Sequence, residues 1–178
     1  NGDSRNARRE LCKIGSKSSI FMAPPCGWRH FFYYAMLEIK SPQTDADWNA
    51  YYALRFSVLR EPWNQPVGSE VLADEDQAIH AIAVENEEVL GVARMHESSE
   101  KQGQVRCVAI ATKAQGKGIG KAIMAYLEEK AKEKGWTEIV LEARENAVPF
   151  YEAIGYTIVA ESYLLFGEIQ HFRMQKSL

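Results

Sequence analysis

The stretch Gln115-Gly-Lys-Gly-Ile-Gly-Lys121 decides the fold, because the periodicity of the sequence changes across it. The β-branched run 104–110 before it predicts a strand, and apolar residues at helical spacing over 119–131 predict an amphipathic helix. Alternating glycines at a helix start let the main chain approach a ligand, while the free amides and the helix dipole favour an anion. With Lys117 and Lys121 adding positive charge, the stretch predicts a phosphate-binding loop.

Two familiar phosphate-binding loops do not match this spacing. A Walker loop needs four residues between its first glycine and the Gly-Lys pair, but only three separate Gly116 from Gly120, and Ala122 stands at the Ser/Thr position. The dinucleotide fingerprint requires glycine where Lys121 stands, and a βαβ unit around it. ATP and NAD are therefore not expected as ligands.

Outward from this loop, the chain predicts helices against a mixed sheet. A helix is expected over 45–59 with Asp45 or Asp47 as its N-cap, and a short helix capped by Asn146 ends at Gly155. Strands are expected over residues 37–40, 78–84, 89–96, 104–110, 139–143, 157–166 and 169–174. The second to fourth of them should form an antiparallel meander, and the last two a hairpin that turns near Gly167. The fold class is α/β, in the sense of an α+β mixed sheet that is mostly antiparallel, twisted and flanked by helices.

The order and spacing of these pieces resemble the GNAT superfamily of acyl-CoA-dependent N-acyltransferases. The resemblance rests on Val108-Ala-Ile110, on the glycine loop with its helix, and on Asn146 followed by Phe150-Tyr-Glu-Ala-Ile-Gly-Tyr156. It covers about residues 37–176 and implies the acyl-CoA N-acyltransferase fold. It also implies an enzyme that moves an acetyl group from acetyl-CoA to an amine by direct attack.

The resemblance implies that acetyl-CoA lies in a splay between the strand ending at Ile110 and the strand over 139–143, and it assigns roles to individual residues. Backbone groups of Val108 and Ile110 would meet the pantetheine arm and the acyl carbonyl, and Asn146 would contact the arm as well. Tyr151 matches the tyrosine that lies near the sulfur and gives its phenol proton to the departing thiolate, so it is the expected general acid. The pyrophosphate would be cradled by the amides of Gln115, Gly116, Lys117, Gly118, Ile119, Gly120 and Lys121.

The general base and the acceptor stay open at this point. Glu70, His96, Glu97 and Glu142 could each face the cleft or solvent, and Cys107 is expected to be buried by packing rather than to act as a nucleophile. The expected acceptor is the primary amine of a small molecule, with a protein lysine or N-terminus as the alternative. A noncatalytic acyl-CoA-binding or protein-interaction module is the alternative from a different class.

Pro62 and Pro66 interrupt regular structure and predict a loop around Trp63. The Trp63 side chain is expected either to pack in the core or to line the substrate site. Acidic side chains follow this loop and could draw a cationic amine or simply form a solvated face. They are Glu70, Asp74, Glu75, Asp76, Glu85, Glu87 and Glu88.

Composition excludes several other classes of protein. The net charge of −3 supplies no overall basic field for nucleic acid, and no apolar run is long enough to span a membrane. Three cysteines without a CxxC pair and four scattered histidines predict neither a disulfide framework nor a metal site, and a cytoplasmic protein is expected.

Residues 1–35 differ from the remainder, with six basic and two acidic side chains and no sustained periodicity. We expect them to form an N-terminal extension, and the residues leave open whether it is non-native, a processed leader or a partner-binding arm. Residues 36–178 are expected to form one acetyltransferase domain. The last two strands could complete a homodimer by edge pairing or strand exchange.

Overall fold

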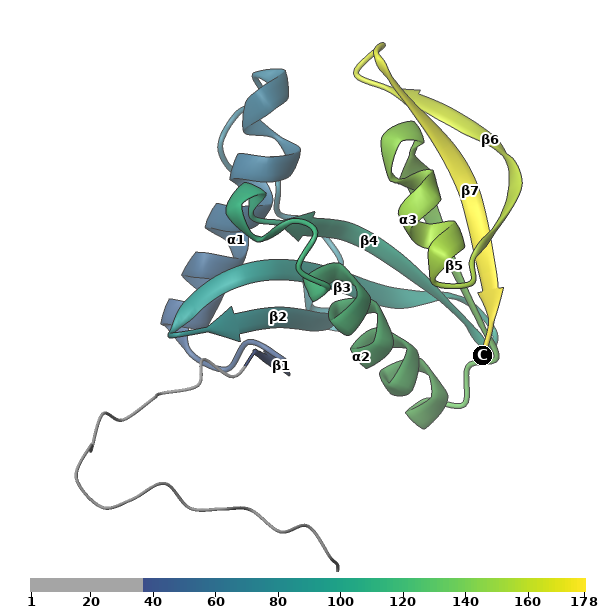
Figure 1. The fold of residues 1–178 in the computed structure, drawn as a ribbon, viewed down its shortest axis with the longest axis horizontal. Helices are drawn as coiled ribbons and strands as arrows, with labels where there is room; N and C mark the ends of the chain where they lie inside the picture. The colour runs from purple at the N-terminus through teal and green to yellow at the C-terminus, as the bar shows by residue number, and fades with distance from the viewer. Residues whose placement is uncertain (1–36) are drawn as a thin grey trace, which may run out of the picture. The chain divides into compact units, whose positions relative to one another are not determined.

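The computed structural model describes residues 37–178, which form a seven-stranded sheet with helices on both faces (Figure 1). The predicted extension over 1–35 lies outside the described residues. Every predicted strand and helix is present, with its bounds shifted by at most three residues. The strands are β1 (Glu38–Lys40), β2 (Ile79–Glu85), β3 (Glu88–Ser99), β4 (Gln102–Ile110), β5 (Glu138–Arg144), β6 (Thr157–Leu165) and β7 (Ile169–Ser177). The α-helices are α1 (Asp45–Leu59), α2 (Ile119–Glu133) and α3 (Val148–Ala153).

The strand order is β1-β2-β3-β4-β5-β7-β6. The predicted antiparallel meander over β2, β3 and β4 is confirmed, and so is the hairpin of β6 and β7. Phe166 and Gly167 form its turn with φ of 54° and 76°, the paired positive values that a tight two-residue hairpin turn needs. The position of β7 between β5 and β6 was not predicted, because it depends on a pairing between segments distant in the sequence.

The sheet opens between β4 and β5, and this opening positions the site. The two strands are parallel neighbours only where Gln102–Val105 pair with Glu138–Leu141. Beyond Val105 a bulge places Cys107 and Val108 opposite a single residue of β3, and Cys107 has a φ of 56°. The bulge bends β4 away from β5, so the two halves of the sheet diverge (Figure 1).

The helices cover opposite faces of the sheet. Along β2, Ala81 and Ala83 pack in the cluster that contains the buried side of α2, while Ile82 between them packs in the cluster beneath α1. Helix α2 lies very close to β3, since a Cβ added at Gly91 would stand 2.7 Å from Cδ1 of Ile123. This close packing fixes where the first turn of α2 meets the opening in the sheet.

The predicted N-cap of α1 is wrong. Thr44 caps the helix: its Oγ1 accepts from the amide of Asp47 at 3.1 Å, and a carboxylate oxygen of Asp47 accepts from the amide of Thr44 at 3.2 Å. Asp47 is thus the third helical residue of a capping box, and Asp45 is the first residue of the helix.

Replacing Thr44 by Ala should lower the free energy of unfolding by about 1 kcal/mol, because an amide of the first turn loses its acceptor. Chemical denaturation measures the change. Thr44→Ser keeps the hydroxyl and should retain most of the stability. Equal losses in the two variants would contradict the capping role.

Strand β6 forms one edge of the sheet and exposes Ile158, Val159 and Leu164. Its ladder with β7 shifts register twice, between Ile158 and Ala160 and between Glu161 and Leu164. Such irregularities discourage edge-to-edge pairing of strands. The homodimer expected through the last two strands stays a prediction.

Candidate active site

A cleft of about 1010 Å³ occupies the opening between β4 and β5. Its lining comes from α2 and α3 on one face of the sheet and from the last turn of α1 on the other, so it passes from face to face. Ten of the eleven predicted cofactor-binding residues line it: Val108, Ile110, Gln115, Gly116, Gly118, Ile119, Gly120, Lys121, Asn146 and Tyr151. Lys117 does not line it.

The glycine loop has the backbone of an anion-binding turn. Gly116 and Gly118 have φ of 75° and 80°, which side-chain-bearing residues rarely adopt. Gly118 is the N-cap of α2 and has no side chain to satisfy the amides of the first turn. Because those amides lie at the cleft and at the positive end of the helix dipole, the loop can hold a phosphate group.

Helix α3 lies against the start of α2. A Cβ at Gly120 would stand 3.1 Å from Cζ of Phe150, so this glycine allows the close contact that brings α3 to the cleft. Asn146 lies in the 3₁₀ turn Glu145–Ala147 that leads into α3, and it does not cap the helix as predicted. Ala147 is the N-cap, and Pro149 in the first turn removes an amide that a cap would satisfy.

Tyr151 lies in the cleft wall with 7% of its surface exposed. Its ring packs between Phe150 and Tyr156, at centroid distances of 4.9 and 5.8 Å. Burial raises the pKa of the phenol well above its usual value, against an opposing effect of the Arg144 charge. The phenol is therefore protonated at neutral pH and can act as a proton donor.

Of the predicted candidates for the general base, only Glu142 lines the cleft. One of its oxygens, Oε1, accepts from Arg173 at 3.4 Å, and Oε2 is buried without a hydrogen-bond partner in the described part of the chain. Glu70 instead accepts from the amide of Gly68 at 2.8 Å, and His96 and Glu97 also lie outside the cleft.

His171 is a cleft residue that sequence reasoning missed. It is 4% exposed and lies on β7 opposite Arg144 of β5, with its ring stacked on Tyr163. Its Nδ1 lies 2.9 Å from the carbonyl oxygen of Ile169, so Nδ1 carries the proton and Nε2 keeps the lone pair. Burial lowers the pKa of the ring, so His171 is neutral at pH 7. No local pattern marks this residue, because only the pairing of β5 with β7 brings it to the site.

Cys107, expected to be buried by packing, is half-buried at the bulge of β4: it packs against the core cluster beneath α1 and also lines the cleft. The left-handed backbone of the bulge turns this residue out of the regular alternation of the strand. Trp63 neither plugs the core nor lines the cleft. It stacks on the guanidinium of Arg144 at 4.4 Å and on Phe166 at 6.5 Å, so it joins the loop after α1 to β5 and to the hairpin.

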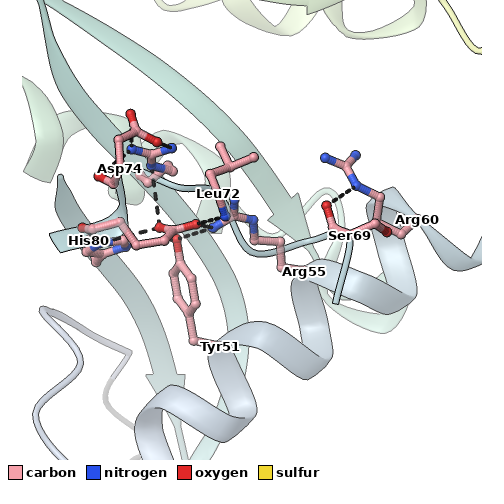
Figure 2. A network of polar contacts seen from close by, with 9 residues as sticks. Tyr51, Arg55, Arg60, Ser69, Leu72, Asp74 and His80 are labelled. Atoms are coloured by element: carbon pink, nitrogen blue, oxygen red, sulfur yellow. Dashed lines mark hydrogen bonds and ion pairs between the residues drawn. The ribbon is translucent and has the colours of Figure 1, made fainter. Parts of the chain in front are cut away.

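Two of the acidic residues form part of a buried ion network rather than a solvated face or an amine trap (Figure 2). Glu75 pairs with Arg55 of α1 at 2.8 Å, and Asp74 pairs with Arg94 of β3 at 2.9 Å. The hydrogen bonds from Arg94 hold the pKa of Asp74 near 2, against burial that would raise it. His80 completes the network through Glu75. These pairs anchor the segment between α1 and β2, whose first turn carries Trp63.

The described residues hold no group of three His, Cys, Asp or Glu side chains placed to bind a metal ion. Over the same residues 37–178, no helix has the length and apolar character needed to cross a membrane.

Comparisons with known proteins agree with this geometry. The model of the acetyltransferase (GNAT) domain matches residues 58–178. The chain is 28% identical over 128 residues to the uncharacterized N-acetyltransferase YjcF of Bacillus subtilis, a match that covers 72% of this chain and 90% of that protein. Escherichia coli ElaA superposes with a TM-score of 0.65 at 22% identity, over 79% of this chain and 99% of that one. An aminoglycoside 6′-N-acetyltransferase complexed with coenzyme A superposes with a TM-score of 0.69 at 16% identity, over 79% and 96% of the two chains.

Proposed function

The chain belongs to the GNAT acetyltransferase family and is an acyltransferase, and from this premise we propose that it moves the acetyl group of acetyl-CoA to the primary amine of a small molecule. The observation that carries the proposal is the cleft that joins the glycine loop on one face of the sheet to Tyr151 and the α1 face. This arrangement offers one place for a phosphate-bearing arm and another for an acceptor.

The residues fit acetyl-CoA in two respects. A Cβ at Gly116 or Gly118 would meet nothing within 4 Å, so a pyrophosphate can approach the main chain of the loop. Beyond Val105, the inner edge of β4 faces the opening and not β5, so Val108 and Ile110 can offer backbone groups to the pantetheine arm. Asn146, at the opposite wall, would contact the same arm.

Two protons must move in the reaction. When bound, acetyl-CoA supplies the thioester carbon, which the amine nitrogen attacks while the carbon–sulfur bond breaks. Tyr151 Oη gives its proton to the departing sulfur, a role that its buried, protonated phenol suits. The proton leaving the amine goes to Glu142 Oε2 or to His171 Nε2, both of which belong to cleft-lining side chains able to accept it.

We place the amine of a small molecule ahead of a protein lysine or N-terminus as the acceptor. Trp63 lies outside the lining of the cleft, and its stacking on Arg144 and Phe166 joins the loop after α1 to the hairpin behind that lining. One structural neighbour is, by its name, an aminoglycoside N-acetyltransferase.

Thermal unfolding with acetyl-CoA, CoA, ATP and NAD tests the cofactor assignment. At about 100 times the Kd, binding to the native state adds about 2.7 kcal/mol, which should raise the melting temperature by several degrees. Acetyl-CoA and CoA should raise it, and ATP and NAD should not. Equal effects of all four, or none from a folded protein, would contradict the assignment. Release of CoA thiol in the presence of an amine then separates an enzyme from a noncatalytic acyl-CoA-binding module.

A further inference from the structure

Three arginines lie along the cleft: Arg60 just after α1, Arg106 on β4 and Arg144 at the end of β5. Side chains alternate along β5, and Leu141 and Ala143 belong to the core beneath α2. Arg144 therefore projects from the other face, where α1 ends. This is the face from which an acceptor would enter.

These arginines differ from the others in the domain. Arg55, Arg94 and Arg173 each lie within 3.4 Å of a carboxylate oxygen. Among the residues that the structure describes, Arg60, Arg106 and Arg144 make no ion pair, as the eleven salt bridges of this part of the chain involve none of them. Within residues 37–178, the cleft thus holds three guanidinium groups that form no ion pair with a carboxylate.

Arg60 and Arg144 are held in place despite this lack of a counter-charge. The guanidinium of Arg144 lies 4.4 Å from the centre of the Trp63 ring, and Nε of Arg60 donates to the carbonyl oxygen of Ser69 at 3.0 Å. Nη1 of Arg60 also donates to the carbonyl oxygen of Leu59 at 3.2 Å, and Figure 2 shows the Arg60 guanidinium lying outside the buried network. Burial lowers the pKa of Arg144, and the nearby charge of Arg60 lowers it further. Two like charges held close together favour an anion between them.

We infer that the acceptor amine also carries a carboxylate or phosphate group, and that Arg60 and Arg144 bind this group. The inference rests on the proposed function, because it names the acceptor of the same site. Arginine is suited to the task, since its planar donors match both kinds of oxyanion and it stays charged when partly buried.

The cleft also indicates where the amine end lies. Glu142 precedes Arg144 by two residues on the same face of β5, which places their backbones about 6.6 Å apart. In an acceptor with an ammonium group at one end and an anion at the other, the ammonium would contact Glu142 and the anion would contact Arg144. A few carbon atoms span that separation. The site therefore suits a small amino acid or amino phosphate rather than an amine without an anionic group.

Binding to the protein–CoA complex tests the inference without requiring turnover. Calorimetry would compare 4-aminobutyrate with n-butylamine and 1,4-diaminobutane, three amines of similar length with an anionic, a neutral or a cationic far end. A second set would compare 2-aminoethyl phosphate with ethanolamine. Tighter binding of the anionic members is expected, by about 10- to 100-fold, the range of one or two charge-assisted hydrogen bonds.

Substitutions of Arg144 and Lys132 test which residue causes the preference for anionic amines. Arg144→Gln should remove most of the preference for the anionic amines while leaving the affinity for CoA within about 2-fold, because Arg144 lies on the acceptor face. Arg144→Lys keeps the charge and should restore part of the preference. Lys132→Gln removes one positive charge from the exposed side of α2, and should change nothing.

The outcomes separate this inference from the proposed function. Preference for butylamine or diaminobutane, or equal binding of all the amines, would overturn the inference and leave acetyl transfer untouched. A preference for anionic amines that survives in Arg144→Gln would also overturn it. Selective binding of the anionic amines without any release of CoA thiol from acetyl-CoA would support the anion site and contradict the transfer reaction. Comparing the carboxylate with the phosphate probe decides which oxyanion the site prefers.

Discussion

Replacing Gly118 by Asp should weaken the binding of CoA and acetyl-CoA at least 100-fold, which is about 2.7 kcal/mol. The new carboxylate would stand at the N-terminus of α2, where the amides and helix dipole favour an anion of the ligand. Two unit charges about 4 Å apart at a protein surface interact with roughly 1 to 4 kcal/mol, and here the interaction is repulsive. Calorimetric titration with CoA measures the loss.

Two further variants separate charge from backbone strain. Gly118→Asn has nearly the shape of Asp without its charge, and Asn tolerates the left-handed backbone that φ of 80° requires. It should retain much more of the affinity. Gly135→Asp introduces the same side chain at a φ of 77° beyond the other end of α2, and should leave CoA binding unchanged. Unchanged affinity in Gly118→Asp would remove the glycine loop from the binding site.

Replacing Tyr151 by Phe should lower kcat by about 100-fold or more while changing the affinity for CoA little, because positioned acid–base groups contribute at least that much. The variant deletes only the phenol oxygen, which has no hydrogen-bond partner within residues 37–178, and keeps the packing of the ring against Phe150. Its stability should therefore stay close to that of the parent protein. Steady-state release of CoA thiol gives kcat, and calorimetry gives the affinity.

Tyr156→Phe is the matched control for this variant. Tyr156 belongs to the same aromatic cluster, but its hydroxyl donates to Glu128 at 3.3 Å and it does not line the cleft. Its kcat should equal that of the parent. Similar losses in both variants would assign the effect to packing, and full activity in Tyr151→Phe would remove Tyr151 as the general acid.

The elements of the fold and the glycine loop were predictable because their signals are local. Periodicity marks α2, and alternating glycines such as Gly116 and Gly118 mark left-handed backbone before a helix, whatever the rest of the chain does. The opening of the sheet between β4 and β5 has no such local signal, and only the family resemblance implied it. It follows from a bulge at Cys107, a residue whose type gives no indication of a positive φ.

Other parts of the site depend on contacts between distant segments. Glu75 and Arg94 have the composition of a charged surface, and only the fold shows that they meet in the interior. His171 enters the cleft because β7 inserts beside β5. The basic character of the cleft was hidden for the same reason, since Arg60 and Arg144 are far apart in the sequence and the net charge of the chain is negative.

If the cleft binds the coenzyme as proposed, the short pairing of β4 with β5 makes the stability of the fold depend on the coenzyme concentration. Past Val105 the backbone groups of β4 and β5 that face each other form no hydrogen bonds across the opening. A bound coenzyme would supply hydrogen-bond partners for them. Each tenfold rise in coenzyme concentration above the Kd adds about 1.4 kcal/mol to folding. In a cell depleted of acetyl-CoA and CoA, a larger fraction of the molecules would unfold and become accessible to proteases. The abundance of the protein would then follow the concentration of the coenzyme that it binds.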